Sequence, residues 1–191
     1  MEISPGIFVI GTSLWIEKER VLIINDLHLG YEGELHARGI LVPKVQYDLI
    51  VKEIGKILAV VNPLQIVING DLKHEFGRIS SQEWKDVLAF LDYLSSKCEE
   101  VIIIQGNHDP IIKPIAEKKN IKVVGLLEVG DSLIVHGDEI VETKCIKSQY
   151  RDIIIQENET MVIGKSLGLA SRTAPTRFAR MMLETEAEMI K

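Results

Sequence analysis

Four short apolar runs, each ending in residues that can bind a metal ion or move a proton, constrain the fold of this chain most. The run Val101–Ile104 is entirely β-branched, and Asn107, His108 and Asp109 follow it after Gly106. Such a run is typical of a buried strand in a parallel sheet. In open α/β sheets, ligands bind in the crevice outside the carboxyl ends of the strands. These three side chains therefore fall where a functional site is expected.

The same arrangement occurs at three other places in the chain. The apolar runs at 21–24, 65–68 and 132–135 lead to Asp26 and His28, to Asp71, and to His136, respectively. One such run is equally compatible with an ordinary strand and a polar turn, because Gly, Asn and Asp are common in turns. Four runs with these endings are much rarer by chance. Oxygen and imidazole ligands together suit manganese, iron or zinc better than calcium.

The spacing of apolar residues predicts strands that alternate with helices. Helices are expected at 31–39, 44–61, 80–97 and 112–119, and strands at 7–10, 13–16, 21–24, 64–68, 101–104, 121–124, 126–129, 133–135, 153–155 and 161–163. Ser80 and Glu83 have the spacing of a capping box, and Trp84 falls on the apolar face of the helix that they open. The first two strands are expected to form a hairpin at a sheet edge. This pattern predicts the α/β class, as a layered α/β sandwich with mixed central sheets flanked by helices.

The motifs at the ends of the apolar runs resemble the calcineurin-like metallophosphoesterases. The matching segments are Asp26-x-His28, Gly70-Asp71, Gly106-Asn107-His108-Asp109 and His136-Gly137. The longer segments Asp26-Leu-His-Leu-Gly30, Arg38-Gly-Ile40 and Gly70-Asp-Leu-Lys-His74 are similar to small archaeal phosphoesterases related to the SbcD nuclease, and to the phosphoesterases found beside bacterial DNA ligases. The resemblance covers about residues 1–163, which we expect to form one metallophosphoesterase-like domain.

The resemblance implies a hydrolase that uses two divalent metal ions to cleave a phosphodiester or a phosphomonoester. Manganese is the expected metal, with iron, zinc or nickel as alternatives. Metals about 3.5–4 Å apart clamp a phosphoryl group and activate water. By resemblance, the ligands of the first metal are Asp26 and His28, the bridging carboxylate is Asp71, and the ligands of the second metal are Asn107 and His136. The implied substrate is a phosphorylated small molecule or a nucleic-acid end.

The resemblance also assigns residues to catalysis and to substrate contact. His108 would face the phosphate, where it stabilises charge or protonates the leaving oxygen, and Asp109 would orient it. His74 is either a substrate-facing residue at the rim of the cleft or a solvated loop residue. Lys73 and Arg38 are further candidates for contacting an anionic substrate, although a lysine in a loop is usually solvated.

Residues 164–191 depart from the family pattern, and we expect them to form an atypical, partly helical tail. The last strand of the family normally ends in Gly-His-x-His, whereas Gly164 is followed here by Lys165, Ser166 and Leu167. Each metal would then keep three protein ligands, counting the bridging carboxylate for both. The tail is either an amphipathic segment that packs on the domain or on a second subunit, giving a homo-oligomer, or the product of a coding change.

Two functions stay open at this point. The intact motifs favour an enzyme whose metal site is weakened by the missing histidine pair. The alternative is a degenerate family member that binds a metal, a ligand or a protein without turnover.

A formal net charge of −6 argues against a broad basic surface for duplex DNA. The two cysteines, Cys98 and Cys145, suggest neither a disulfide framework nor a structural zinc site. No apolar run is long enough to span a membrane, so a reduced cytoplasmic protein is expected.

Overall fold

The computed structural model describes residues 1–76 and 79–137, together with the backbone of residues 152–157 and 160–165. Contacts between residues divide the chain into two compact units, Met1–Val124 and Gly125–Lys191. The first unit contains β1 (Glu2–Ser4), β2 (Ile7–Ile10), β3 (Ser13–Ile16), β4 (Val21–Ile24), α1 (Tyr31–Ala37), α2 (Gln46–Leu58), β5 (Gln65–Asn69), α3 (Ser81–Ser95), β6 (Glu100–Ile104), α4 (Lys113–Glu117) and β7 (Lys122–Val124). The second contains β8 (Leu126–Val129), β9 (Ser132–Val135), β10 (Asp152–Glu157) and β11 (Thr160–Lys165).

The sheet of the first unit has seven strands in the order β1-β2-β3-β4-β5-β6-β7. Neighbouring strands are antiparallel from β1 to β4 and parallel from β4 to β7. The predicted hairpin of β2 and β3 is confirmed, but the edge strand is β1, which was not predicted because its three residues carry no apolar run. Since β4, β5 and β6 are parallel neighbours, their carboxyl ends lie at the same edge of the sheet. The expected mixed α/β class is confirmed.

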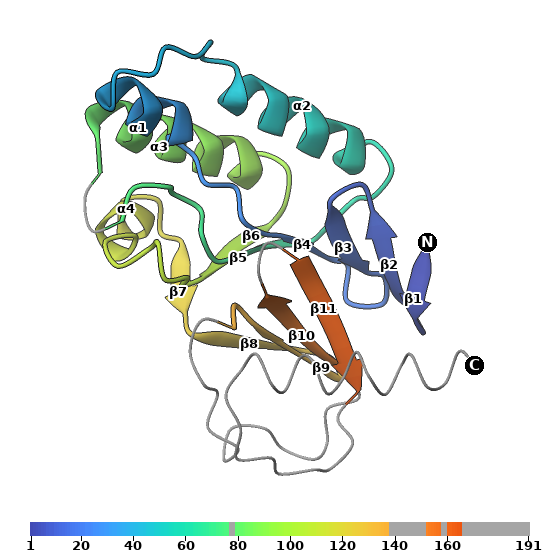
Figure 1. Ribbon diagram of the computed structural model, residues 1–191. Coiled ribbons are helices and arrows are strands. Elements are labelled where there is room, and N and C mark those ends of the chain that lie inside the picture. Colours follow the sequence, from blue (N-terminus) through green and yellow to red (C-terminus); the bar gives the residue numbers. More distant parts are fainter. Residues whose placement is uncertain (77–78, 138–151, 158–159, 166–191) are drawn as a thin grey trace. The chain divides into compact units, whose positions relative to one another are not determined.

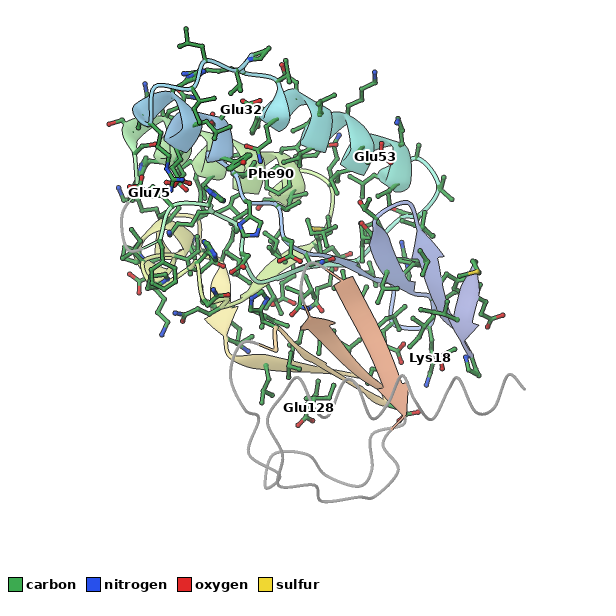
Figure 2. All side chains as sticks on the ribbon, in the orientation of Figure 1. Lys18, Glu32, Glu53, Glu75, Phe90 and Glu128 are labelled. Carbon is green, nitrogen blue, oxygen red and sulfur yellow. The ribbon has the colours of Figure 1, made fainter. Side chains whose placement is uncertain are left out.

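The helices α2 and α3 cover one face of this sheet (Figure 1). Their apolar side chains pack against alternate residues of the parallel strands, because successive side chains of a strand point to opposite faces. Phe90, labelled in Figure 2, lies in this core between α3 and the strands. The core is closed by further buried residues, among them Leu22, Ile24, Ile54, Ile57, Ile66, Ile68, Leu91, Leu94, Val101 and Ile103.

The start of α3 follows the sequence prediction closely. The side-chain oxygen of Ser80 accepts a hydrogen bond from the backbone N–H of Glu83, and the Glu83 carboxylate accepts one from the backbone N–H of Ser80. This reciprocal pair satisfies two donors that the first helical turn leaves unpaired. Trp84 packs against the core as predicted, with the Lys118 ammonium 4.7 Å from the centre of its ring. The helix α1 differs from α3, since it has no side-chain cap and none of its residues is buried.

The second unit contains a four-stranded sheet in the order β11-β10-β9-β8. The predicted hairpin at Gly130 and Asp131 is confirmed, because β8 and β9 pair as antiparallel neighbours. The strand β9 belongs to this sheet, so His136 does not follow a strand of the sheet that holds β4, β5 and β6. The domain boundary expected after residue 163 stays a prediction, and β11 runs past it to Lys165. Residues 166–191 lie outside the described part of the chain.

The expectations about cysteines and membrane spans can be compared with the described residues. Cys98 is a free cysteine, whereas Cys145 falls outside the described range. The longest described helix, α3, has 15 residues, and no helix in the described part of the chain has the length and hydropathy of a membrane span.

Candidate metal centre

The loops after β4, β5 and β6 bring the predicted motifs of the first unit together. The backbones of Asp26, His28 and Asp71 lie in the left-handed region, with φ of +50°, +44° and +49°. Residues with side chains rarely adopt this conformation, and it persists only where the surrounding structure enforces it. Such backbone strain clusters at functional sites. The strained positions in these loops are the residues that the sequence identifies as metal ligands.

Backbone hydrogen bonds hold the first two loops side by side. The N–H of His28 donates to the carbonyl of Asp71 at 2.9 Å, and the N–H of Leu29 donates to Leu72 at 2.9 Å. The N–H of His74 returns a bond to the carbonyl of Leu29 at 3.0 Å. This short parallel ladder fixes the spacing of His28 from Asp71 through the main chain rather than through their side chains.

Asp26, His28 and Asp71 form a group that can hold a divalent metal ion. The Nε2 atom of His28 lies 4.0 Å from Oδ1 of Asp26 and 3.7 Å from Oδ2 of Asp71. One ligand atom from each of the three residues falls within 4.8 Å of the others. Carboxylate oxygens with an imidazole nitrogen are a donor set that manganese, iron and zinc accept. The residues present therefore fit the group that the sequence predicts.

His108 is anchored to both neighbouring loops. Its backbone N–H donates to Oδ1 of Asp71 at 3.0 Å, and its Nδ1 atom lies 2.7 Å from the carbonyl oxygen of His74. A carbonyl oxygen only accepts hydrogen bonds, so we assign the proton to Nδ1. In the neutral ring, Nε2 of His108 then carries the lone pair.

The Asp109 carboxylate binds the backbone of two neighbouring loops, and its expected role in orienting His108 stays a prediction. The Asp109 carboxylate is fully buried and accepts hydrogen bonds from the backbone N–H groups of Leu72, Lys73 and Gly106 at 3.2, 3.3 and 3.4 Å. Burial raises the pKa of Asp109 from 3.8 to about 6, while the backbone donors act in the opposite direction. The carboxylate thus ties the loop after β6 to the loop after β5. Buried peptide N–H groups need an acceptor, and this carboxylate supplies one to all three.

His74 lies at this centre rather than in a solvated loop. Its Nε2 atom is 2.5 Å from Oε2 of Glu34, and its ring packs edge-on against Tyr31, with ring centres 4.7 Å apart. Glu34 also pairs with Arg38, four residues further along the chain. Sequence analysis missed Glu34, since nothing in the pattern of α1 separates it from an ordinary exposed helix residue. A substrate contact by His74, Lys73 or Arg38 stays a prediction.

Lys73 is fully buried, so the expectation of a solvated loop lysine is wrong. Its ammonium donates to the backbone carbonyl of Glu75. The backbone N–H of Lys73 belongs to the set that binds Asp109. In this structure both polar ends of Lys73 are engaged by the protein, which explains how a charged residue is accommodated in the interior.

Glu83 supports the centre from the start of α3. Its Oε1 atom accepts hydrogen bonds from the backbone N–H groups of His74 and Glu75 at 2.9 and 3.0 Å. Gly30, which follows the first loop, has φ of +98°, and a Cβ atom there would lie 2.8 Å from Cγ of Glu83. The capping-box spacing predicted the contact of Glu83 with Ser80. Its contacts with the metal-centre loops had no sequence signal, because they join segments that only the fold brings together.

The other two predicted ligands, Asn107 and His136, come from the loop after β6 and from the second unit. Asn107 is exposed in the loop after β6, adjacent to His108. His136 is buried in the second unit. Their participation in a metal site stays a prediction. The backbone of Lys165 ends β11, at the place where the resemblance expects a histidine.

Comparisons with known proteins bear on the family and on the fold of the chain. The family model for calcineurin-like phosphoesterases matches residues 19–167. A nuclease from Pseudomonas putida, MPE, has a similar structure, with a TM-score of 0.51 at 18% identity over 68% of this chain and 60% of the nuclease. A protein of unknown function from Aquifex aeolicus gives a TM-score of 0.39 at 17% identity, over 61% of this chain and 59% of the other. No curated protein matches the chain. The chain spans about three fifths of the nuclease, and at this identity the likeness concerns the fold alone.

Proposed function

Because the chain belongs to the calcineurin-like phosphoesterase family, we propose that it hydrolyses a phosphoester with the help of metal ions held by Asp26, His28 and Asp71. The observation that carries this proposal is the meeting of these three donors within 4.8 Å, on loops with enforced left-handed backbones. Backbone strain of this kind clusters at functional sites, which supports the proposal. Divalent ions supply Lewis-acid stabilisation of the phosphoryl charge and a lowered pKa for water.

The residues of the chain have separate tasks in this proposal. Asp26 and Asp71 offset the positive charge of the metal. The hydrogen bond from the His108 backbone to Asp71 keeps that carboxylate in place, at 3.0 Å. The His108 ring is anchored through Nδ1, so its Nε2 atom is available to face a phosphate, stabilise its charge or, when protonated, donate to the leaving oxygen.

The finer parts of the proposal rest on the family resemblance. We propose a dinuclear site in which Asp71 bridges and Asn107 and His136 complete the second position, with manganese as the preferred metal. The substrate is a phosphorylated small molecule or a nucleic-acid end, and the similarity in fold to a nuclease is compatible with the latter. His74, Lys73 and Arg38 are the candidates for contacting it. Association through residues 164–191 and a cytoplasmic location stay predictions.

A second function is favoured by one observation. The strand β11 ends at Lys165, where the family pattern has a histidine. A protonated lysine repels a divalent metal, and the lost imidazole removes a neutral donor. The alternative is therefore a degenerate family member that binds one metal, a ligand or a protein without turnover.

Activity on a chromogenic phosphodiester, bis(p-nitrophenyl) phosphate, with excess Mn²⁺ separates the two functions. The enzyme proposal expects turnover above a metal-only blank. Asp71→Asn keeps the shape of the side chain but removes its charge, so activity should fall by about 100-fold or more. Asp48→Asn, in the first turn of α2, is the matched control and should leave the rate unchanged. Absence of turnover in the unmodified protein, together with measurable Mn²⁺ binding, would favour the non-catalytic alternative.

A further inference from the structure

A second set of potential ligands lies beside the carboxylates, and it consists of three imidazoles. His28, His74 and His108 each place one ring nitrogen within 4.8 Å of the others. Their ring centres are 4.9 Å apart for His28 and His108, 5.3 Å for His28 and His74, and 5.8 Å for His74 and His108. Three imidazoles on one tetrahedral zinc ion, with Zn–N bonds of about 2.0–2.1 Å, have ring centres roughly 5 Å apart. The spacing of the three ring centres is therefore compatible with one shared ion.

In two of these rings, one nitrogen is engaged by a protein oxygen, so the other nitrogen can bind a metal. Nδ1 of His108 donates to the carbonyl of His74, which leaves Nε2 with the lone pair. Nε2 of His74 faces the carboxylate of Glu34, which leaves Nδ1 with the lone pair in the neutral ring. A histidine that binds a metal almost always donates its other ring N–H to a carboxylate or to a backbone carbonyl. These two rings show both forms of that support.

The remaining nitrogen of His74 gives an independent indication of a ligand. Nδ1 of His74 is buried, and it has no hydrogen-bond partner among the residues that the structure describes. A buried polar atom that is left unpaired destabilises the folded state by about 1–3 kcal/mol. A metal ion bound to this nitrogen would remove that penalty.

We propose that His28, His74 and His108 form a zinc site that competes with the metal held by Asp26, His28 and Asp71. A set of three imidazoles suits zinc, with the fourth tetrahedral position open to water, whereas carboxylate-rich sets suit manganese. A neutral imidazole offers one lone pair, so His28 serves one ion at a time. Zinc at the three histidines then displaces the ion of the carboxylate group and also occupies His108. This inference goes beyond the proposed hydrolysis and requires no turnover.

Metal binding to the full-length protein after removal of metals with EDTA tests the proposal. Zn²⁺ affinity is measured by competition with a chromogenic chelator, and X-ray absorption of the zinc-loaded protein counts the imidazole ligands. The expected result is one tightly bound zinc with three imidazoles. When Zn²⁺ is added to protein loaded with Mn²⁺, the electron paramagnetic resonance signal of aqueous Mn²⁺ should increase as manganese is displaced.

Variants at the two groups should have opposite effects. His74→Asn should lower Zn²⁺ affinity by at least about 10–100-fold, because it removes a ligand and not merely a supporting contact, and it should leave Mn²⁺ affinity within about two-fold. Asp26→Asn should weaken Mn²⁺ and spare Zn²⁺. Glu34→Gln, which alters only the support of His74, should lower Zn²⁺ affinity by about 10-fold. His36→Asn, on α1 and outside the cluster, is the matched control and should change neither affinity.

The outcomes that contradict the proposal are specific. Equal Zn²⁺ affinity in His74→Asn and in the unmodified protein would overturn it, as would a zinc ion with fewer than three imidazoles. Loss of Zn²⁺ binding in Asp26→Asn with retention in His74→Asn would place zinc at the carboxylates instead. Thermal unfolding followed by circular dichroism checks that each variant is folded. Because the measurements use binding alone, an inactive protein would contradict the proposed hydrolysis without deciding the zinc site.

Discussion

Buried side chains are held in different ways in two regions of the molecule. One region is the core between the helices and the seven-stranded sheet, and the other is the set of loops at the ends of β4, β5 and β6. The core consists of apolar side chains such as Phe90 and Leu91, whose burial is non-directional. The loops bury charged groups instead, namely Asp71, Lys73, Glu83 and Asp109. Each of the last three binds backbone atoms of another segment or of its own loop. Apolar packing tolerates changes of shape, whereas a buried charge requires its particular partners.

Because of this difference, we expect the contributions of the two regions to stability to depend differently on pH. The apolar core contains no group that titrates, so its contribution to stability should be nearly independent of pH. The loops contain Asp109, whose burial raises the pKa of its carboxyl, so the contribution of this group to stability should change with pH. The helix α1 belongs to the region of the loops. It buries no residue of its own, and its Glu34 carboxylate pairs with His74.

The largest expected effect on the free energy of unfolding comes from a substitution in the apolar core. Phe90→Ala deletes a fully buried ring in α3 and should lower the free energy of unfolding by about 3–5 kcal/mol, through lost burial and the cavity that remains. Urea unfolding at several pH values should give the same loss at each. The control is Leu49→Ala in α2, whose side chain is 59% exposed, with an expected change within about 0.5 kcal/mol. A Phe90→Ala loss that varied strongly with pH would break the comparison.

The second prediction concerns Asp109 in the metal-free protein. Its pKa is raised from 3.8 to about 6, so between these values the folded state holds a proton that the unfolded state has released. Folding then binds a proton, and stability falls as the pH rises through this interval, with no further loss above about pH 6. The decline is up to about 3 kcal/mol.

Urea unfolding in EDTA from pH 4 to 7.5 measures the Asp109 effect. Asp109→Asn should be less stable at low pH, because an amide presents one acceptor oxygen to the N–H groups of Leu72, Lys73 and Gly106. Its stability should lack the decline between about pH 4 and 6. Parallel pH profiles for the variant and the unmodified protein would show that Asp109 does not titrate as its burial requires.

The smallest effect uses two glycines that share a backbone conformation but differ in surroundings. Gly30 and Gly39 have φ of +98° and +81°, and a Cβ atom would lie 2.8 Å from Glu83 at Gly30 but meet nothing within 4 Å at Gly39. Gly39→Ala should cost about 1 kcal/mol for the left-handed backbone. Gly30→Ala should cost about 1–3 kcal/mol more, since Glu83 must move away from the backbone of His74 and Glu75. Equal losses, measured by thermal unfolding, would indicate that Glu83 is free to adjust.

Much of the fold was predictable from local patterns in the sequence. The strands β2, β3 and β4 have the predicted bounds, and the capping box at Ser80 and Glu83 is present. These features depend on the periodicity and chemistry of neighbouring residues, so they can be read without knowing what packs against them. The convergence of Asp26, His28 and Asp71 was also predictable, because parallel strands bring their carboxyl ends to one edge.

Other features could not be predicted, for an identifiable reason. The strand β9 has the same apolar pattern as β4 but belongs to the second sheet, because strand pairing depends on long-range contacts. Asp109 follows His108 directly, and its carboxylate binds the backbone of the loop after β5, a contact that had no signal in the sequence. The partner of a buried charge is selected from all the donors that the fold brings near it, and adjacency in sequence does not decide which donor is close enough.

The sequence by itself determined that side chains able to bind a metal ion follow several apolar runs of the chain. The tertiary structure decided what each one contacts: Glu34 binds His74, Lys73 is buried, and Glu83 supports the loops that carry the metal ligands. The physical reason is that residue type and periodicity are local properties. Ligand geometry, the position of ring protons and the pKa of a buried carboxyl depend on atoms that come from distant parts of the chain.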